Sequence, residues 1–381
     1  MTTPPRVTVL TATYNGTRYL AATIESVLAQ TFEDFEYVVV DDASTDESAQ
    51  MVADFAARDA RIRLVRNAEN LNPAGALNRG LAVARGEYLA ILDHDDLALP
   101  NRLAAQVAFL DAEPDFGAVG AQARCIDETG ATIKKFLYPV DAAVARWNLF
   151  FGATLLHSAS MYRRALVAEV GGYSAQHKFI CDYDLLIRLA ERSRIGNLPD
   201  ELTCYRRSTT QVSANNHRPQ TGQMFLLQYA MQARWLGVRP SLQVVNDLVD
   251  WLYSRRAPAQ GAVAVVEWMR AMWERYVDSV ALSAEDTTVL GRALGQRWMS
   301  MAHTTYAGQR ELARVCWSRA WEHDPLLLQR PENWQRLREL RQRDAEYARK
   351  VAAAITEAES TQAKSEEADS AQAVAARPTT A

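Results

Sequence analysis

One stretch of the chain, residues 87–96, reads Glu87-Tyr88-Leu89-Ala90-Ile91-Leu92-Asp93-His94-Asp95-Asp96. Its first part is almost wholly apolar, which is typical of a short strand that is buried on both faces. Its end places three carboxylates within four residues, and a carboxylate removed from water needs a positive partner. Because Asp93 and Asp95 lie two residues apart, a turn after the strand would let both face one hard cation. The alternative is a turn in which these residues only cap the next helix, a role that suits Asp96 best.

The overall composition is that of an ordinary globular protein. The 381 residues are 48% apolar and 23% charged, which leaves room for two or three domains with a large core. A net charge of −4 argues against nucleic acid as the partner. The cysteines are scattered without the spacing of a zinc or redox site, so we expect free thiols in a reducing cytosol. They are Cys125, Cys181, Cys204 and Cys316.

The sequence shows no targeting or membrane-spanning segment. Residues 1–6 lead straight into a predicted strand, so we expect no signal peptide and a cytoplasmic protein. No apolar run reaches the roughly 18–20 residues that cross a bilayer. Peripheral contact with the inner face of a membrane stays open.

The first 115 residues alternate short apolar runs with helical patterns of about ten residues. This alternation predicts βαβ units and a parallel sheet with helices on both faces. In such sheets ligands bind beyond the carboxyl ends of the strands, where residues 11–15, 41–42 and 93–95 follow predicted strands. Ser44 and Glu47 have the spacing of a capping box for the second helix. The predicted strands are 7–10, 37–40, 62–65 and 88–92.

The pattern changes after residue 115 and again near residue 219. The middle of the chain predicts strands at 118–120, 132–137, 158–163 and 202–207 and helices at 141–149 and 181–189. Beyond it, strand signals vanish, helical spacing continues, and eight of the nine tryptophans occur. We therefore expect an α/β domain over 1–216 with halves at about 1–115 and 116–216, then a helical domain over 217–350. The last segment, 351–381, is expected to be disordered because it is polar, alanine-rich and lacks aromatic residues.

Taken together, the short motifs of residues 6–216 resemble those of the family 2 glycosyltransferases with the GT-A fold, in the same order and spacing. The motifs are Thr13-Tyr14-Asn15, Asp41-Asp42-Ala43-Ser44-Thr45-Asp46, residues 70–80, Gly86-Glu87-Tyr88, Leu92-Asp93-His94-Asp95-Asp96, Gly171-Gly172-Tyr173, Asp182-Tyr183-Asp184-Leu185 and Tyr205-Arg206. This resemblance implies a Rossmann-like, mostly parallel sheet and a nucleotide-diphosphate sugar donor, with a UDP-sugar as the default. It also implies Mn²⁺ or Mg²⁺ as the cofactor and usually inversion at the anomeric carbon.

The resemblance assigns roles on the donor side. Asp42 should accept a hydrogen bond from the base, with Tyr14 beside it and Asp41 behind. Asp95 matches the metal-binding position, and Asp93 is directed to the ribose or to the metal. The resemblance implies that Arg206 lies near the diphosphate, whose oxygens an arginine can bind bidentately. The remaining expected donor-binding residues are Thr11, Asn15 and Asn78.

On the acceptor side, inversion by direct displacement needs a base opposite the leaving group. The family position for this base is Asp182, and Cys181 stands where the family usually has Glu. The competing interpretation is that Asp182 or Asp184 only stabilises a helix N-terminus. Asp184 suits a pair with Arg188 four residues later. His157 lies where close relatives often carry His beside the acceptor cleft.

Two other functions compete with glycosyl transfer. A sugar nucleotidyltransferase uses a similar sheet but would need a Gly-rich, Arg-containing loop after the first strand, which residues 11–16 lack. A non-catalytic scaffold would use the Trp-rich helices to bind a protein partner, and Cys181 favours it. For a transferase, the acceptor stays open among a polysaccharide, a lipid-linked glycan and a protein.

Overall fold

The computed structural model describes residues 4–208, 217–254, 256–258, 260–305, 309–324 and 327. The chain divides into two compact units. The first contains residues up to 249 together with 268–290, and the second contains 250–267 and the residues from 291. The domain boundaries expected near 216 and 350 stay predictions, and the tail expected at 351–381 lies outside the described residues.

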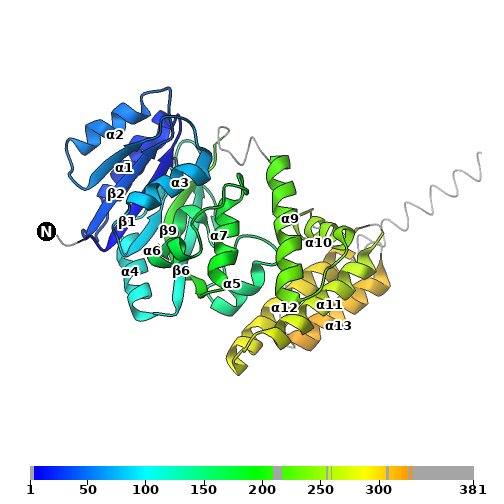
Figure 1. Cartoon of the computed structure of the whole chain (residues 1–381). Helices are drawn as coiled ribbons and strands as arrows, with labels where there is room; N and C mark the ends of the chain where they lie inside the picture. Colours follow the sequence, from blue (N-terminus) through cyan, green and yellow to red (C-terminus); the bar gives the residue numbers. More distant parts are fainter. Residues whose placement is uncertain are drawn as a thin grey trace, which may run out of the picture. The chain divides into compact units, whose positions relative to one another are not determined.

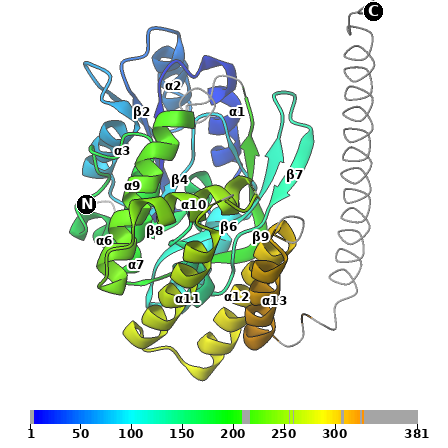
Figure 2. The ribbon, with the colours of Figure 1, turned by 90° about the vertical axis from the view of Figure 1, so that its right-hand side faces the viewer.

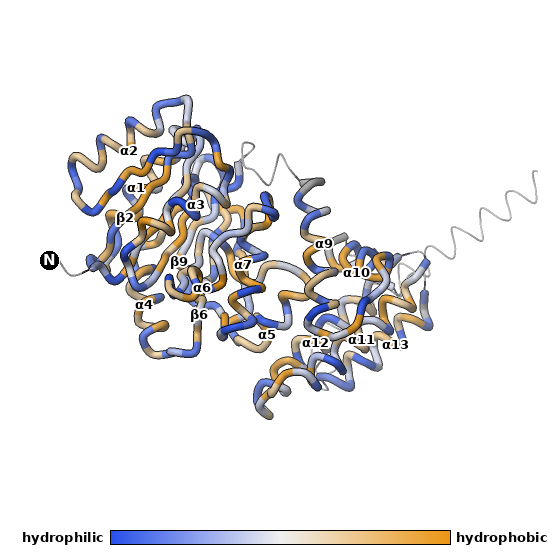
Figure 3. The backbone as a smooth tube through the Cα atoms, in the orientation of Figure 1, coloured by the Kyte–Doolittle hydropathy of each residue, from blue (hydrophilic) through white to orange (hydrophobic). Residues whose placement is uncertain are grey.

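The amino-terminal half of the sheet is parallel, as the alternating pattern predicts (Figure 1). Strand β1 lies between β2 and β4, and β3 pairs with β2, all in parallel register. All seven residues of β2 are buried, and β1 and β2 are coloured mainly as hydrophobic in Figure 3. The elements are β1 (Val7–Thr13), α1 (Thr17–Leu28), β2 (Phe35–Asp41), α2 (Ser48–Ala56), β3 (Ile62–Arg66), α3 (Asn72–Val83) and β4 (Tyr88–Ile91).

The second half of the sheet mixes parallel and antiparallel pairs. Among the described residues the strands form one nine-stranded sheet in the order β3-β2-β1-β4-β8-β6-β9-β5, with β7 paired to β6. Figure 2 shows β7 beside β6 as the second arm of a hairpin. The elements are β5 (Leu97–Ala98), α4 (Arg102–Ala112), β6 (Phe116–Ile126), β7 (Thr132–Phe136), α5 (Ala142–Asn148), η1 (His157–Ala159), β8 (Met161–Arg163), α6 (Arg164–Glu169), α7 (Cys181–Ala190) and β9 (Arg194–Arg206).

Close packing between α3 and the sheet depends on a glycine. A Cβ atom on Gly80 would lie 2.2 Å from Cδ1 of Leu10 and 3.1 Å from Cγ2 of Val40, both of which are fully buried. Real Cβ atoms do not approach carbon so closely, so a larger residue would push α3 off β1 and β2. This contact holds the loop before α3 close to the carboxyl end of β2.

One local prediction was wrong, and two predicted strands are present with other bounds. The capping box fails because α2 begins only at Ser48, and the Ser44 hydroxyl instead accepts from the backbone N of Asn15. The strand expected over 158–163 begins as the 3₁₀ turn His157–Ala159. The strand expected from 202 begins already at Arg194.

The described part of the chain after residue 216 is helical, as the apolar spacing predicts. Trp251 and Trp298 are buried, whereas Trp321 is 56% exposed. Within the described residues, no helix is both long and apolar enough to cross a membrane. All four cysteines are free and buried. The helices are α9 (His217–Leu236), α10 (Leu242–Ser254), α11 (Ala262–Ser279), α12 (Ala284–Thr305) and α13 (Arg310–His323).

Candidate active site

The loop that holds the three carboxylates is fixed by hydroxyl groups from distant segments. The backbone N of Asp93 donates to Oγ of Ser158 at 3.0 Å. The hydroxyl of Thr23, on α1, lies 2.9 Å from the carbonyl oxygens of both His94 and Asp96. These contacts set the turn that follows β4 and therefore the direction of its acidic side chains.

Asp96 points into the protein and does not cap a helix. It is fully buried, and its Oδ1 accepts from the backbone N of Arg206 at 2.7 Å. The N-cap of α4 is Asn101, which makes no side-chain capping bond, so the capping alternative is wrong for Asp96. Asp93 keeps 44% of its side chain exposed. The loop thus turns one carboxylate inward and leaves another accessible.

Arg206 ties the end of β9 to this loop. Its Nε donates to the carbonyl O of Asp95 at 2.9 Å and its Nη1 to the carbonyl O of Asp127 at 3.1 Å. The guanidinium lies over the ring of Tyr19, 4.6 Å from its centroid. Arg206 is buried and oriented by backbone oxygens next to the carboxylate loop. Its expected contact with a diphosphate stays a prediction.

Arg102 is a buried arginine whose positive charge lies close to the acidic cluster. The sequence analysis did not predict it as part of the site. Arg102 is 1% exposed, and its guanidinium donates to Ile91 O at 2.6 Å and to Gln106 Oε1 at 3.1 Å. Burial lowers the pKa of Arg102 to about 10, while the charges of Asp96 and Asp93 oppose that shift. Burial, together with the charges of Asp95 and Asp93, raises the pKa of Asp96 well above its usual value. The three carboxylates therefore still repel one another, although the positive charge of Arg102 lies close to them.

Replacing Arg102 with methionine should lower the free energy of unfolding by about 3–5 kcal/mol, the usual cost of removing one partner from a buried charged network. The variant removes the guanidinium donor from the carbonyls of Ile91 and Ser160 and the positive charge from beside Asp96. Urea unfolding followed by circular dichroism measures the change. Arg58→Met is the matched control because Arg58 is exposed on the surface, where substitutions change stability by about 0.5 kcal/mol or less. A loss for Arg102→Met as small as that of the control would contradict the network.

The loops after β1 and β2 meet at the same edge of the sheet. Asn15 has a φ of 52°, and its Oδ1 accepts from the backbone N of Thr45 at 2.8 Å. A Cβ atom on Gly16 would lie 2.8 Å from Cδ2 of His94, so this loop also touches the carboxylate loop. Tyr14 is 47% exposed beside it. The three expected polar clusters therefore do share one edge.

Thr11 has a different position from these loop residues. It is fully buried, and its hydroxyl donates to Leu92 O at 2.7 Å and lies 3.0 Å from the Tyr37 hydroxyl. These bonds link β1 to the residue before Asp93. Thr11 therefore supports the site from inside the sheet, and a direct donor contact stays a prediction.

The two adjacent aspartates at the end of β2 have unlike surroundings. Oδ1 of Asp42 accepts from Asn67 Nδ2 at 2.7 Å and from Leu71 N at 2.9 Å. Asp41 is fully buried, and neither of its carboxylate oxygens has a hydrogen-bond partner among the described residues. The Nε of Arg66 lies 3.6 Å from Oδ2 of Asp41. An acidic pair with unused acceptor capacity thus ends this strand.

His157 connects the carboxylate loop to the segment before α7. Its Nδ1 lies 3.3 Å from Oδ1 of Asp93, and its Nε2 lies 3.1 Å from the hydroxyl of Tyr173. Burial lowers the pKa of His157, but the charge of Asp93 and the hydrogen bond to it outweigh burial and raise that pKa above its usual value. Asp182 adds to this rise, so Asp93, His157 and Asp182 lie in one electrostatic neighbourhood.

Asp182 lies in the first turn of α7, as expected, and is half-buried. Burial is the largest cause of the raised pKa of Tyr138, and the charges of Tyr205 and Asp182 raise it further. Asp184 accepts from Arg188 Nε at 2.9 Å, which confirms the expected pair four residues apart. The thiol of Cys181 is buried, and burial together with the charge of Asp182 raises its pKa. This part of the site therefore combines one accessible carboxylate with one that is fixed by an ion pair.

Asn78 positions the glycine turn before α7. Its Nδ2 donates to Tyr173 O at 2.7 Å, and its Oδ1 accepts from Tyr173 N at 2.8 Å. Gly172 has a φ of +67°, and a Cβ there would lie 2.6 Å from Oδ1 of Asn78, so this position requires glycine. Asn78 thus holds Tyr173 near His157, and its expected contact with the nucleotide stays a prediction.

The carboxylate loop fits a hard cation that is held partly by a ligand. Within the described ranges, no three His, Cys, Asp or Glu side chains are grouped as a complete metal site. Mg²⁺ and similar ions, however, often use one or two protein carboxylates together with phosphate oxygens. The mutual repulsion at Asp93, Asp95 and Asp96, seen in the raised pKa of Asp96, is what a cation would relieve.

Comparisons with known proteins give the family. Residues 8–171 match the model of glycosyl transferase family 2. The chain is 35% identical over 208 residues to the putative glycosyltransferase EpsE of Bacillus subtilis, a match that covers 53% of this chain and 73% of EpsE. The chain therefore belongs to glycosyl transferase family 2 and is a glycosyltransferase, which confirms the family resemblance.

Solved structures confirm the GT-A fold. Staphylococcus aureus TarS 1–349 in complex with UDP-GlcNAc has a TM-score of 0.52 at 17% identity, covering 85% of this chain and 92% of that one. The mannosyltransferase PcManGT from Pyrobaculum calidifontis, in complex with GDP-Man and Mn²⁺, has a TM-score of 0.50 at 22% identity, covering 83% and 88%. At these identities the likeness concerns the fold.

Proposed function

We propose that this glycosyltransferase moves a sugar from a nucleotide-diphosphate donor to an acceptor hydroxyl with inversion at the anomeric carbon. The observation that carries the proposal is that Nδ1 of His157 lies 3.3 Å from Oδ1 of Asp93, and that the charges of Asp93 and Asp182, from two distant segments, both raise the pKa of this histidine. The structural neighbours TarS and PcManGT bind UDP-GlcNAc and GDP-Man, which supports a nucleotide-sugar donor. A UDP-sugar is the default choice.

On the donor side, the base is assigned to Asp42 and Tyr14, with Asp41 behind them. The hydrogen bond from the backbone N of Thr45 to Oδ1 of Asn15 links the loops after β1 and β2 beside these residues. Arg206 is assigned to the diphosphate and Asn78 to the nucleotide. Thr11 supports the site from inside the sheet. In this proposal the sugar and diphosphate lie between the loop after β1 and the carboxylate loop.

A divalent cation, Mn²⁺ or Mg²⁺, is assigned to Asp95 with Asp93. When bound, such an ion neutralises the negative charge that develops on the departing diphosphate. The Mn²⁺ in the PcManGT complex supports this assignment. His94, between the two aspartates, is left as a spacer because hard cations prefer oxygen ligands.

On the acceptor side, Asp182 is the base. Its carboxylate takes the proton from the acceptor hydroxyl as that oxygen forms a bond to the anomeric carbon. The bond between this carbon and the diphosphate oxygen breaks at the same time, and the nucleoside diphosphate leaves. His157 and Tyr173 border this region. The acceptor is a polysaccharide, a lipid-linked glycan or a protein, and a protein partner is assigned to the helical region from 217 to 350.

Thermal-shift measurements test the donor and the cation together. A donor at about 100 times its Kd stabilises the native state by about 2.7 kcal/mol, so the melting temperature should rise by about 3–5 °C. We expect this rise for one of UDP-, GDP- and dTDP-sugars with Mn²⁺, and a much smaller one without it. No rise with any of the three donors in the presence of Mn²⁺ would refute the proposal.

A further inference from the structure

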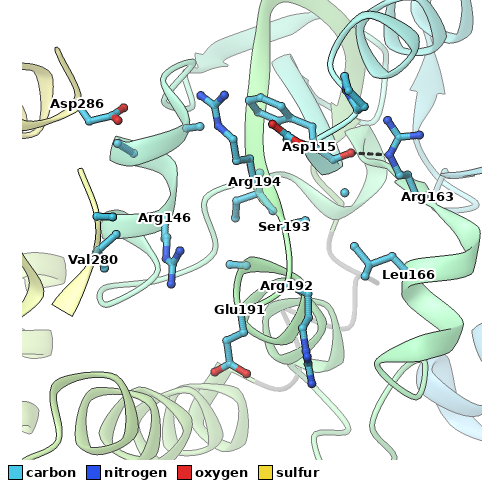
Figure 4. A pocket seen from close by; sticks show the side chains of 18 of the residues that line it. Asp115, Arg146, Arg163, Leu166, Glu191, Arg192, Ser193, Arg194, Val280 and Asp286 are labelled. Carbon is cyan, nitrogen blue, oxygen red and sulfur yellow. Dashed lines mark hydrogen bonds between the residues drawn. The ribbon is translucent and has the colours of Figure 1, made fainter. Parts of the chain in front are cut away.

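The first compact unit contains a cavity of about 910 Å³ that the proposed transfer reaction does not use (Figure 4). Arg194 and Phe116, which line it, pair at the starts of β9 and β6. Arg163, also in its wall, pairs with Tyr88 at the start of β4. The carboxylate loop follows the opposite end of β4, so the cavity lies at the other edge of the sheet from the proposed transfer site.

Two hydrogen-bond donors in the cavity wall are buried without a partner. Tyr276 is 1% exposed, and its hydroxyl has no hydrogen-bond partner among the described residues. The Nε of Arg146 is also buried and equally unsatisfied in the described part of the chain. Burial raises the pKa of Tyr276 to about 12, so its hydroxyl keeps its proton. An unsatisfied buried donor destabilises the fold, and an acceptor that bonded to it would remove that cost.

The arginines that line the cavity, residues 146, 163, 192 and 194, are matched in number by its carboxylates, but they differ in their contacts. Arg146 and Arg194 lie over aromatic rings, 5.3 Å from the centroid of Trp235 and 4.6 Å from that of Phe116. Neither forms an ion pair within the described residues. Arg163, by contrast, donates to the carbonyls of Phe116 and Leu110 and is used by the fold.

Two of the carboxylates in the cavity wall already have ion-pair or hydrogen-bond partners. Glu191 forms an ion pair with Arg234 and accepts from Trp235 Nε1 at 2.6 Å. Asp286 accepts from the Ser283 hydroxyl at 2.7 Å. Asp115 and Glu169 are the other acidic lining residues. Among the described residues, the buried side-chain polar atoms of the wall that lack a hydrogen-bond partner are Nε of Arg146 and the hydroxyl of Tyr276, and both can donate.

We propose that this cavity binds a small molecule that carries an oxyanion, a phosphate or a carboxylate, held by Arg146, Arg194 and the hydroxyl of Tyr276. The planar guanidinium matches both oxyanions bidentately. The volume is within the range of about 300–1,000 Å³ of small-molecule sites. Apolar residues such as Leu166 and Val280 complete the wall and would contact the body of the ligand.

Calorimetric titration of the full chain tests this site in the absence of donor and divalent cation. The probes are inorganic phosphate, glucose 1-phosphate, glucuronate and neutral glucose. We expect at least one anionic probe to bind and glucose not to bind. Binding of glucose 1-phosphate alone identifies a phosphate ligand, and binding of glucuronate alone identifies a carboxylate. Arg146→Gln should weaken binding by about tenfold or more.

Three variants make the test specific. Tyr276→Phe keeps the buried ring and should weaken binding several-fold, so it decides the matter if Arg146→Gln fails to fold. Asp95→Asn, which alters the proposed transfer site, should bind the probe like the native chain, and so should the exposed control Arg58→Gln. Absence of binding by every anion, unchanged binding in Tyr276→Phe, or loss of binding in Asp95→Asn would each overturn the proposal.

Discussion

Replacing Asp182 with asparagine should lower kcat by about 10²–10⁴-fold, the usual contribution of a general base. The asparagine side chain has nearly the same shape, but its amide cannot take a proton from the acceptor hydroxyl. Because Asp182 is assigned to the acceptor side, the affinity for the donor should stay unchanged. Single-turnover transfer measures the chemical step, and the thermal shift with donor and Mn²⁺ measures donor binding.

Asp184 provides the matched control on the same helix. It lies two residues further along α7 and pairs with Arg188, so Asp184→Asn should lower stability while leaving kcat of the folded enzyme nearly unchanged. Equal losses of kcat in the two variants would show that α7 is only a structural element. Full turnover by Asp182→Asn would remove the assigned base altogether.

The parallel half of the fold could be predicted because its signal is local. Each residue of β2 is buried, and its central run Tyr37–Val40 is apolar and ends visibly at Asp41 and Asp42. The strands β6 and β9 lack this signal because buried polar residues interrupt them. Gln122 donates to Leu198 O at 2.8 Å and accepts from Tyr138 N at 2.6 Å. Such residues suit a strand interior only once their distant partners are in place.

The candidate site, too, could be predicted from the sequence only in part. Its carboxylates follow strands and could be placed at one edge from topology alone. The groups that orient them come from elsewhere: Ser158 bonds Asp93, and Thr23 bonds the carbonyls of the loop. Arg102 follows the cluster by only six residues, and the need of three carboxylates for a positive partner was a signal for it. The sequence analysis assigned that need to a bound cation alone.

Removing the carboxylate of Asp95 should have an effect as large as removing the base. If Asp95 holds the cation at the diphosphate, Asp95→Ala loses several kcal/mol of stabilisation of the departing group, or roughly 10³-fold in transfer. The Mn²⁺-dependent part of the thermal shift with donor should disappear as well. Exposed Glu25 on α1 supplies the control, since Glu25→Gln removes a charge without touching the loop.

Chelation of the cation distinguishes a metal ligand from a residue that merely shapes the loop. EDTA should reduce transfer by the native enzyme about as much as Asp95→Ala does, and it should reduce the residual activity of the variant little further, because both changes remove the same interaction. If the two losses multiply instead, Asp95 and the cation act independently. The carboxylate loop would then shape the donor pocket, and the cation would have to bind through other oxygens.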